Sequence, residues 1–195
     1  MPIHTFGDSH AIMGWNTFPG IDVHSIGPVL CYSFGREKKA RLDVVHYGVK
    51  EGDTVIFCFG EIDCRCHINK YVSEERPYQD IIDDIVSNYF EAIRENVSDL
   101  KIKTCVYNVV PPIEKYNTVE NPEYPYLGSD EDRKGYVLYF NEQLKKLCQK
   151  YEYVFFDVYD KYTDDRGFLL KALSDGNVHI AKGRYLQDFL YTITL

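Results

Sequence analysis

The sequence predicts an α/β protein, a three-layer α/β/α sandwich in which a five-stranded, mainly parallel sheet lies between helices. Short apolar runs alternate along the chain with longer segments of helical periodicity, the pattern of consecutive βαβ units. Runs such as residues 55–59 are apolar without alternation, as expected of a strand covered on both faces. Because no linker, repeat or low-complexity tract interrupts the 195 residues, we expect residues 1–195 to form a single domain.

Five segments have the composition of strands. Each is rich in Val, Ile, Phe, Tyr or Cys and has a turn or loop signal near one end. The expected strands are residues 2–6, 21–26, 54–59, 102–110 and 153–158.

Helical periodicity is clearest between the third and fourth expected strands. Apolar residues recur there at helical spacing and predict a helix from about residue 77 to 99. Ser129, with Asp132 three residues later, predicts the start of a second helix that runs to about residue 150. Further helices are expected over residues 41–49 and from 181 towards 191. Residues 111–128, with four prolines and three tyrosines, predict a long surface loop of the kind that often carries function.

Composition excludes several classes of partner. A net charge of −8 opposes binding to a phosphate backbone, and no basic run longer than residues 36–39 compensates it, so we expect no nucleic-acid partner. No segment approaches a membrane span and the first residues do not resemble a secretory signal, so we expect no membrane partner and a cytoplasmic protein. Among six cysteines, Cys58 and Cys105 lie inside expected strands, which favours reduced, buried thiols.

Two segments far apart in the sequence carry residues suited to acyl transfer. Ser9 directly follows the first strand, so its hydroxyl lies at the carboxyl edge where open α/β sheets build their sites. Asp175 and His179 precede the last helix, and a carboxylate there can reach Nδ1 of the imidazole and fix its tautomer. A serine needs such a base to accept its proton. These residues predict a Ser9–His179–Asp175 triad.

Acyl transfer also needs hydrogen-bond donors that stabilise the oxyanion. Gly27 follows the second strand and allows its backbone to approach a ligand closely. Residues 60–65 bring further polar groups to the same edge after the third strand.

This pattern resembles the SGNH hydrolases, the GDSL-like esterase and lipase superfamily. The residues that carry the resemblance are Gly7-Asp8-Ser9-His10 for the first block, with His10 in place of the usual leucine, Gly27 for the second, Gly60-Glu61-Ile62-Asp63 for the third, and Asp175 with His179 for the fifth. The resemblance implies a flavodoxin-like three-layer fold and ester cleavage through a serine nucleophile. It also implies an oxyanion hole formed by the serine and by residues of the second and third blocks, with no cofactor and no metal.

Two departures from the family pattern change the expected site. Ile62 stands where the family has an asparagine donor, and we expect Arg65, oriented by Asp63, to replace that donor beside the backbone N–H groups of Ser9 and Gly27. Alternatively, Arg65 is only a salt-bridge partner of Glu61 or Asp63. The spacing from Asp175 to His179 is one residue longer than usual, which leaves Asn177 and Asp157 as alternative partners of the imidazole. Asp8, His10, Glu61, Asp63 and Asn177 are the expected supporting positions.

Other interpretations of the same residues are weaker. Residues 63–67 hold two cysteines and a histidine, but their spacing does not suit zinc, and a thiolate beside Arg65 is a minor alternative. His10 is expected to line the site or to lie at the start of a helix, and not to act as the base. Aromatic residues could form a wall for a sugar or acyl group; the candidates are Trp15, Tyr116, Tyr124 and Tyr126.

We therefore expect a serine esterase that removes a small acyl group, preferably O-acetyl, from a small-molecule or carbohydrate ester. The same triad would serve an O-acyltransferase, and the missing asparagine leaves open an inactive carbohydrate-binding or scaffold domain.

Overall fold

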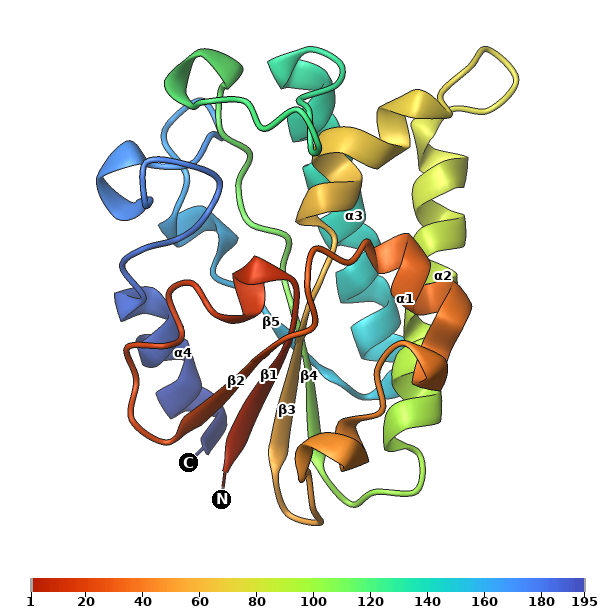
Figure 1. The fold of residues 1–195 in the computed structure, drawn as a ribbon, viewed down its shortest axis with the longest axis vertical. Coiled ribbons are helices and arrows are strands. Elements are labelled where there is room, and N and C mark those ends of the chain that lie inside the picture. The colour runs from red at the N-terminus through yellow and green to blue at the C-terminus, as the bar shows by residue number, and fades with distance from the viewer. Residues whose placement is uncertain (1, 195) are drawn as a thin grey trace.

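A five-stranded sheet forms the centre of the computed structural model, which describes residues 2–194 (Figure 1). The strand order is β2-β1-β3-β4-β5, and every pairing is parallel. The strands are β1 (Ile3–Gly7), β2 (Ile21–Ser25), β3 (Thr54–Cys58), β4 (Lys103–Tyr107) and β5 (Val154–Phe156). Gly7 is in register with Ser25 and with Cys58, so three loops leave the sheet at the same level of its carboxyl edge.

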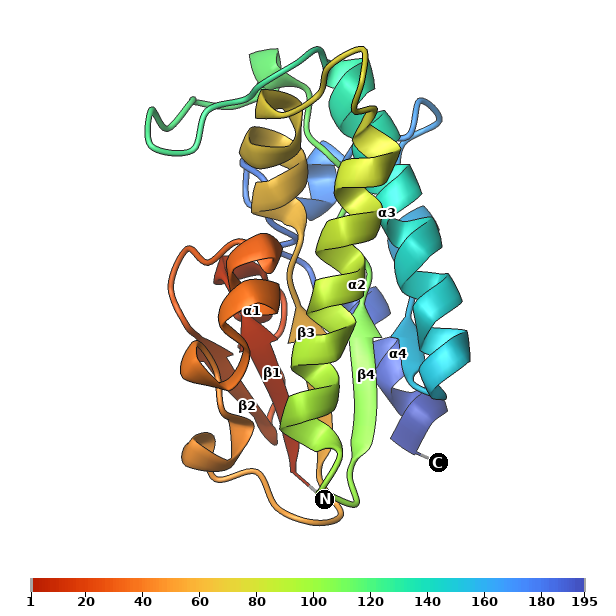
Figure 2. The ribbon, with the colours of Figure 1, turned by 90° about the vertical axis from the view of Figure 1, so that its right-hand side faces the viewer.

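Helices cover both faces of the sheet, which confirms the predicted three-layer α/β fold. One face packs against α1 (Cys31–Glu37), α2 (Tyr78–Val97) and α3 (Asp130–Tyr151), which lie together in Figure 2. The other face packs against α4 (Arg184–Thr194). Alternate residues of β3 enter the two cores, Val55 and Phe57 on one side and Ile56 and Cys58 on the other. This explains why the strand is apolar without alternation.

The two long helices form where the sequence predicts them. In α2, the residues of the apolar stripe are buried against the sheet and α1. At the start of α3, the Ser129 hydroxyl accepts a hydrogen bond from the Asp132 N–H, and the Asp132 carboxylate accepts one from the Ser129 N–H. This capping box satisfies two N–H groups that a helix start leaves without partners.

The expected helix at residues 41–49 is wrong, and α1 is missing from the expectation. Only a short 3₁₀ turn, Val44–Tyr47, forms there, because Asp43 caps its start and Gly48, with a φ of +87°, ends it. α1 instead forms from Cys31, where the sequence carries no local cap. The Asp63 carboxylate, distant in sequence, accepts hydrogen bonds from the N–H groups of Cys31 (2.6 Å) and Tyr32 (3.0 Å).

The fourth strand is shorter than expected because asparagine side chains take over its hydrogen bonds. The Asn141 side-chain amide bonds both the N–H and the carbonyl of Val109, and the side-chain oxygen of Asn108 accepts a hydrogen bond from the Val158 N–H. The chain therefore leaves the sheet after Tyr107 and enters the long loop, residues 111–128, where a single 3₁₀ turn forms at Lys115–Asn117. The last helix, α4, begins at Arg184, three residues later than expected.

All six cysteines are buried, and none is paired with another. Within the described residues, no helix combines the length and apolar character needed to cross a membrane.

Candidate active site

Ser9 lies on a tight turn that directly follows β1. Gly7 ends the strand so close to β3 that a Cβ at this position would lie 2.0 Å from the Cys58 carbonyl oxygen, which only glycine allows. Asp8 then caps a 3₁₀ turn, its carboxylate accepting from the His10 N–H at 2.8 Å. Ser9 is the first residue of this turn, and its hydroxyl remains exposed above the sheet edge.

The structure brings the three residues of the predicted triad together. Ser9 Oγ lies 2.7 Å from His179 Nε2, and His179 Nδ1 lies 2.7 Å from an oxygen of Asp175. A neutral imidazole that donates from Nδ1 to the carboxylate leaves Nε2 free to accept the serine proton. The three side chains therefore form one hydrogen-bonded chain across 170 residues of sequence.

The electrostatic surroundings set the protonation states of His179 and Asp175. Burial lowers the pKa of His179, and the positive charge of His10 lowers it further, while Asp175 opposes both. Burial works to raise the pKa of Asp175, but the hydrogen bond from His179 and two backbone N–H groups lower it overall. At neutral pH the imidazole is therefore neutral and the carboxylate is ionised.

A turn at Gly176 accommodates the longer spacing between the carboxylate and the histidine. Gly176 has a φ of +86°, and one oxygen of Asp175 accepts the N–H groups of Asn177 and His179, which leaves the other oxygen for the imidazole. Asn177 accepts from the Thr118 hydroxyl, and Asp157 accepts from the Tyr159 N–H. Neither alternative partner contacts the imidazole, so Asp175 orients His179.

A cavity of about 200 Å³ opens beside Ser9 and His179. Pro28 and Ile62 form part of its wall, and Tyr124 and Tyr126 from the long loop form another part. Gly27, one residue before Pro28, has a φ of +88°, and its N–H donates weakly to the Ser25 hydroxyl at 3.3 Å. The cavity has room for a small acyl group next to the Ser9 hydroxyl.

Arg65 reaches this cavity, but Glu61 and not Asp63 orients it. Its Nε and Nη2 donate to the two carboxylate oxygens of Glu61 at 2.8 and 3.0 Å, and Nη1 donates to the Tyr124 carbonyl at 2.6 Å. The expected pairing with Asp63 is wrong, because Asp63 caps α1 instead. A guanidinium has five N–H groups, so two remain available to a ligand. The i, i+4 spacing of Glu61 and Arg65 is the sequence signal for this pair.

His10 is buried against His179, as expected of a residue that lines the site. Its ring centroid lies 4.8 Å from that of His179, and its Nδ1 lies 2.8 Å from the Asp8 carboxylate. The prediction of an aromatic wall is only partly correct. Tyr124 and Tyr126 line the cavity, whereas Trp15 is fully buried in the core against Tyr107 and Phe156 and Tyr116 is 74% exposed.

The cysteines near the site are not reactive thiolates. Burial raises the pKa of Cys66 to about 11 and that of Cys64 well above its usual value, and the Cys66 thiol donates to the Ile62 carbonyl. Among residues 2–194, no group of three or more His, Cys, Asp or Glu side chains is arranged to hold a metal ion.

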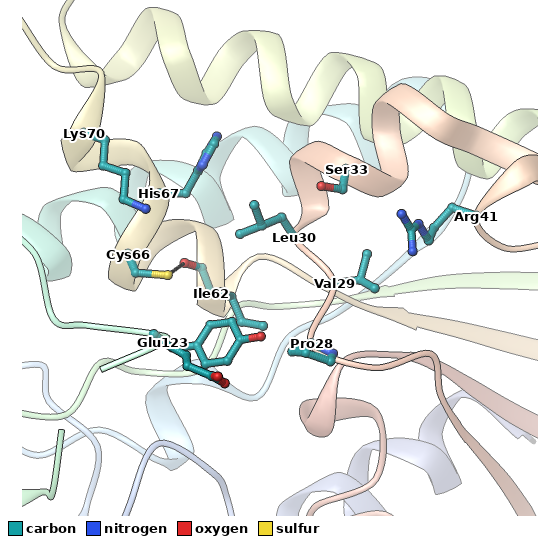
Figure 3. Close-up of a pocket in the computed structure, with 11 residues that line it drawn as sticks. Pro28, Val29, Leu30, Ser33, Arg41, Ile62, Cys66, His67, Lys70 and Glu123 are labelled. Carbon is teal, nitrogen blue, oxygen red and sulfur yellow. Dashed lines mark hydrogen bonds between the residues drawn. The ribbon is translucent and has the colours of Figure 1, made fainter. Parts of the chain in front are cut away.

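A second cavity of about 260 Å³ adjoins the first, and sequence reasoning missed it (Figure 3). The two cavities share Pro28, Ile62 and Tyr124 as wall residues. Arg41 and Lys70 approach the second cavity from opposite sides. Its other polar lining residues include Ser33, His67 and Glu123. The lining comes from four separate segments of the sequence, so no local motif signals it.

Solved structures with the same fold are GDSL-like lipases and esterases. A GDSL-like lipase from Bacteroides thetaiotaomicron is 13% identical, with a TM-score of 0.65 over 99% of this chain and 86% of that chain. An acetylxylan esterase from Geobacillus stearothermophilus is 11% identical, with a TM-score of 0.61 over 98% and 92%. The aryl esterase of M. smegmatis is 13% identical, with a TM-score of 0.59 over 98% of both chains.

No family model matches the sequence, and no curated protein matches it. At these identities the structural likeness shows the fold, and it confirms the predicted fold of SGNH hydrolases. The roles of individual residues are therefore inferred from the geometry of the site and not from these neighbours.

Proposed function

We propose that the protein is a serine esterase that hydrolyses small acyl esters through an acyl-enzyme. The observation that carries this proposal is the continuous hydrogen-bonded chain from Ser9 through His179 to Asp175, next to an open cavity. The structural likeness to lipases and esterases supports ester bonds as the target.

In the proposed mechanism, His179 accepts the Ser9 proton as Ser9 Oγ attacks the ester carbonyl. The backbone N–H groups of Ser9 and Gly27 and the free N–H groups of Arg65 stabilise the tetrahedral oxyanion. The Gly27 N–H exchanges its long hydrogen bond to Ser25 for one to this oxygen. His179 then protonates the leaving alcohol. In the second half of the reaction, water gives a proton to His179 and attacks the acyl-enzyme, and the acid and the Ser9 hydroxyl are released.

The cavities support a substrate with a small acyl group and a larger polar alcohol. The first cavity, about 200 Å³, suits an acetyl group and its ester carbonyl. The second combines apolar walls with polar groups, as expected of a site for a hydroxylated ring such as a sugar. The charges around the second cavity are largely balanced. Glu37 pairs with Arg41, and the cavity lining contains the negative Glu123 as well as the positive Lys70. We therefore favour O-acetyl groups on a neutral carbohydrate, and a structural neighbour is an acetylxylan esterase.

Hydrolysis of p-nitrophenyl acetate, butyrate and octanoate, and of acetylated sugars, tests the proposal. We expect the wild type to turn over the acetate fastest, and Ser9→Ala and His179→Ala to lose activity. Ser98→Ala and His46→Ala are matched controls, because both residues are exposed and Ser98 lies at the far end of α2. Acyl transfer to an added sugar in place of hydrolysis would identify an O-acyltransferase. Saccharide binding by a folded wild type without turnover would contradict the esterase.

A further inference from the structure

His10 occupies a buried position between the nucleophile turn and the loop that carries the catalytic histidine. Only 6% of the residue is exposed. Its Nδ1 lies 2.8 Å from the Asp8 carboxylate, and its Nε2 lies 3.3 Å from the carbonyl oxygen of Val178, the residue before His179. A single side chain therefore links the two segments that form the catalytic pair.

Both contacts of the imidazole are with oxygens that can only accept. A neutral imidazole has one N–H donor, and its other nitrogen, an acceptor, would face an oxygen lone pair. Both contacts are satisfied only when both nitrogens carry protons. The geometry therefore favours an imidazolium at His10.

The surroundings of His10 favour this charge. Asp8 is fully buried, and His10 is its ion-pair partner among the described residues, while the second carboxylate oxygen of Asp8 has no hydrogen-bond partner there. Without His10 the Asp8 charge would be buried and uncompensated, which is costly. Burial alone would lower the pKa of His10, but Asp8, and more weakly Glu61, raise it to about 9.

None of the other titratable groups that line the small cavity beside His10 carries a positive charge that would disfavour protonation of His10. Cys58, at the end of β3, and Tyr107, at the end of β4, have pKa values raised by burial and stay neutral. The Glu61 carboxylate is paired with the guanidinium of Arg65. On the remaining side lies His179, at a ring-centroid distance of 4.8 Å.

We propose that His10 is a positioning residue of the triad, a buried imidazolium that ties the His179 loop to the Ser9 turn and keeps His179 neutral. The role rests on the proposed esterase mechanism, in which His179 must accept a proton. A positive charge next to His179 disfavours a second one, so the base stays available at lower pH. When His179 accepts the serine proton during attack, Asp175, hydrogen-bonded to its Nδ1, stabilises the His179 imidazolium.

The charge state of His10 can be measured without any substrate, by ¹⁵N NMR of the histidine side chains between pH 5 and 8. We expect the His10 nitrogens of the wild type to show two bound protons throughout. A His10 ring that loses a proton within this range would overturn the proposal. Because this titration does not depend on turnover, it stays informative if the esterase assay fails.

Variants test the effect on His179. In His10→Gln the charge is lost, and we expect His179 to titrate at higher pH than in the wild type. The acid limb of kcat/KM should then move to higher pH, so activity falls more at pH 5 than at pH 8. His10→Lys, which returns a positive charge, should move the titration back towards the wild-type value. His46→Gln is the matched control at an exposed histidine.

A folded His10→Gln in which His179 titrates as in the wild type would overturn the proposal, and so would a His10→Lys that behaves like His10→Gln. Circular dichroism establishes whether each variant folds. If His10→Gln does not fold, the wild-type titration of His10 decides.

Discussion

Replacement of Arg65 by methionine tests whether this residue serves as the oxyanion donor that Ile62 cannot supply. Three of the five guanidinium N–H groups bind Glu61 and the Tyr124 carbonyl, which leaves two for the substrate oxygen. Loss of one oxyanion donor costs roughly 10²–10³ in kcat, or about 2.7–4 kcal/mol. We therefore expect Arg65→Met to lower kcat for p-nitrophenyl acetate by about two to three orders of magnitude, with a smaller change in KM.

The same substitution also removes the partner of a buried carboxylate. The Glu61 side chain is only 10% exposed, and an unpaired buried charge costs about 3–5 kcal/mol of stability. The double variant Glu61→Gln/Arg65→Met removes both charges and serves as the matched control for folding. Steady-state kinetics with thermal unfolding of both variants separates the two effects. If either variant is folded and its kcat stays within about threefold of the wild type, Arg65 is not the donor and the reasoning is refuted.

Three further substitutions have defined outcomes. Asp175→Asn should lower kcat by about 10³–10⁴, because an amide that donates to Nδ1 stabilises the wrong tautomer of His179, and a loss below tenfold in kinetics would contradict this role. Asp63 has its pKa raised by burial to about 7, so its ionisation costs stability as pH rises from about 4 through 7. Chemical unfolding at pH 5 and 8 should show the wild type losing about 2–3 kcal/mol more than Asp63→Asn over this range, and equal losses would refute the assignment. Gly7→Ala should prevent folding or lower the melting temperature strongly, because its Cβ would overlap the Cys58 carbonyl, and an unchanged melting temperature would contradict the packing described.

The elements that the sequence predicts correctly are those with local signals. Periodic apolar residues and a capping box define α2 and α3, and apolar runs define the strands. α1 has no such signal, because its start is capped by Asp63, a residue 32 positions away. Its Gly35 also packs so closely on α2 that a Cβ would lie 3.0 Å from Asn88. Contacts of this kind depend on the tertiary structure.

The functional site likewise has parts that the sequence predicts and a part that it does not. Ser9, His179 and Asp175 are predictable because topology brings the carboxyl ends of parallel strands together. The expectation that Asp63 orients Arg65 is wrong, because the helical i, i+4 spacing pairs Arg65 with Glu61. The second cavity, assembled from four separate segments, leaves no pattern in any one of them.

The central claim is that Ser9 is an activated nucleophile, and covalent labelling tests it most directly. The wild type, Ser9→Ala and His179→Ala would each be treated with a fluorophosphonate and analysed by intact-mass and peptide mass spectrometry. We expect one adduct per chain at Ser9 in the wild type, much slower labelling in His179→Ala and none in Ser9→Ala. A folded wild type that stays unlabelled, or that is labelled at another residue, would contradict it.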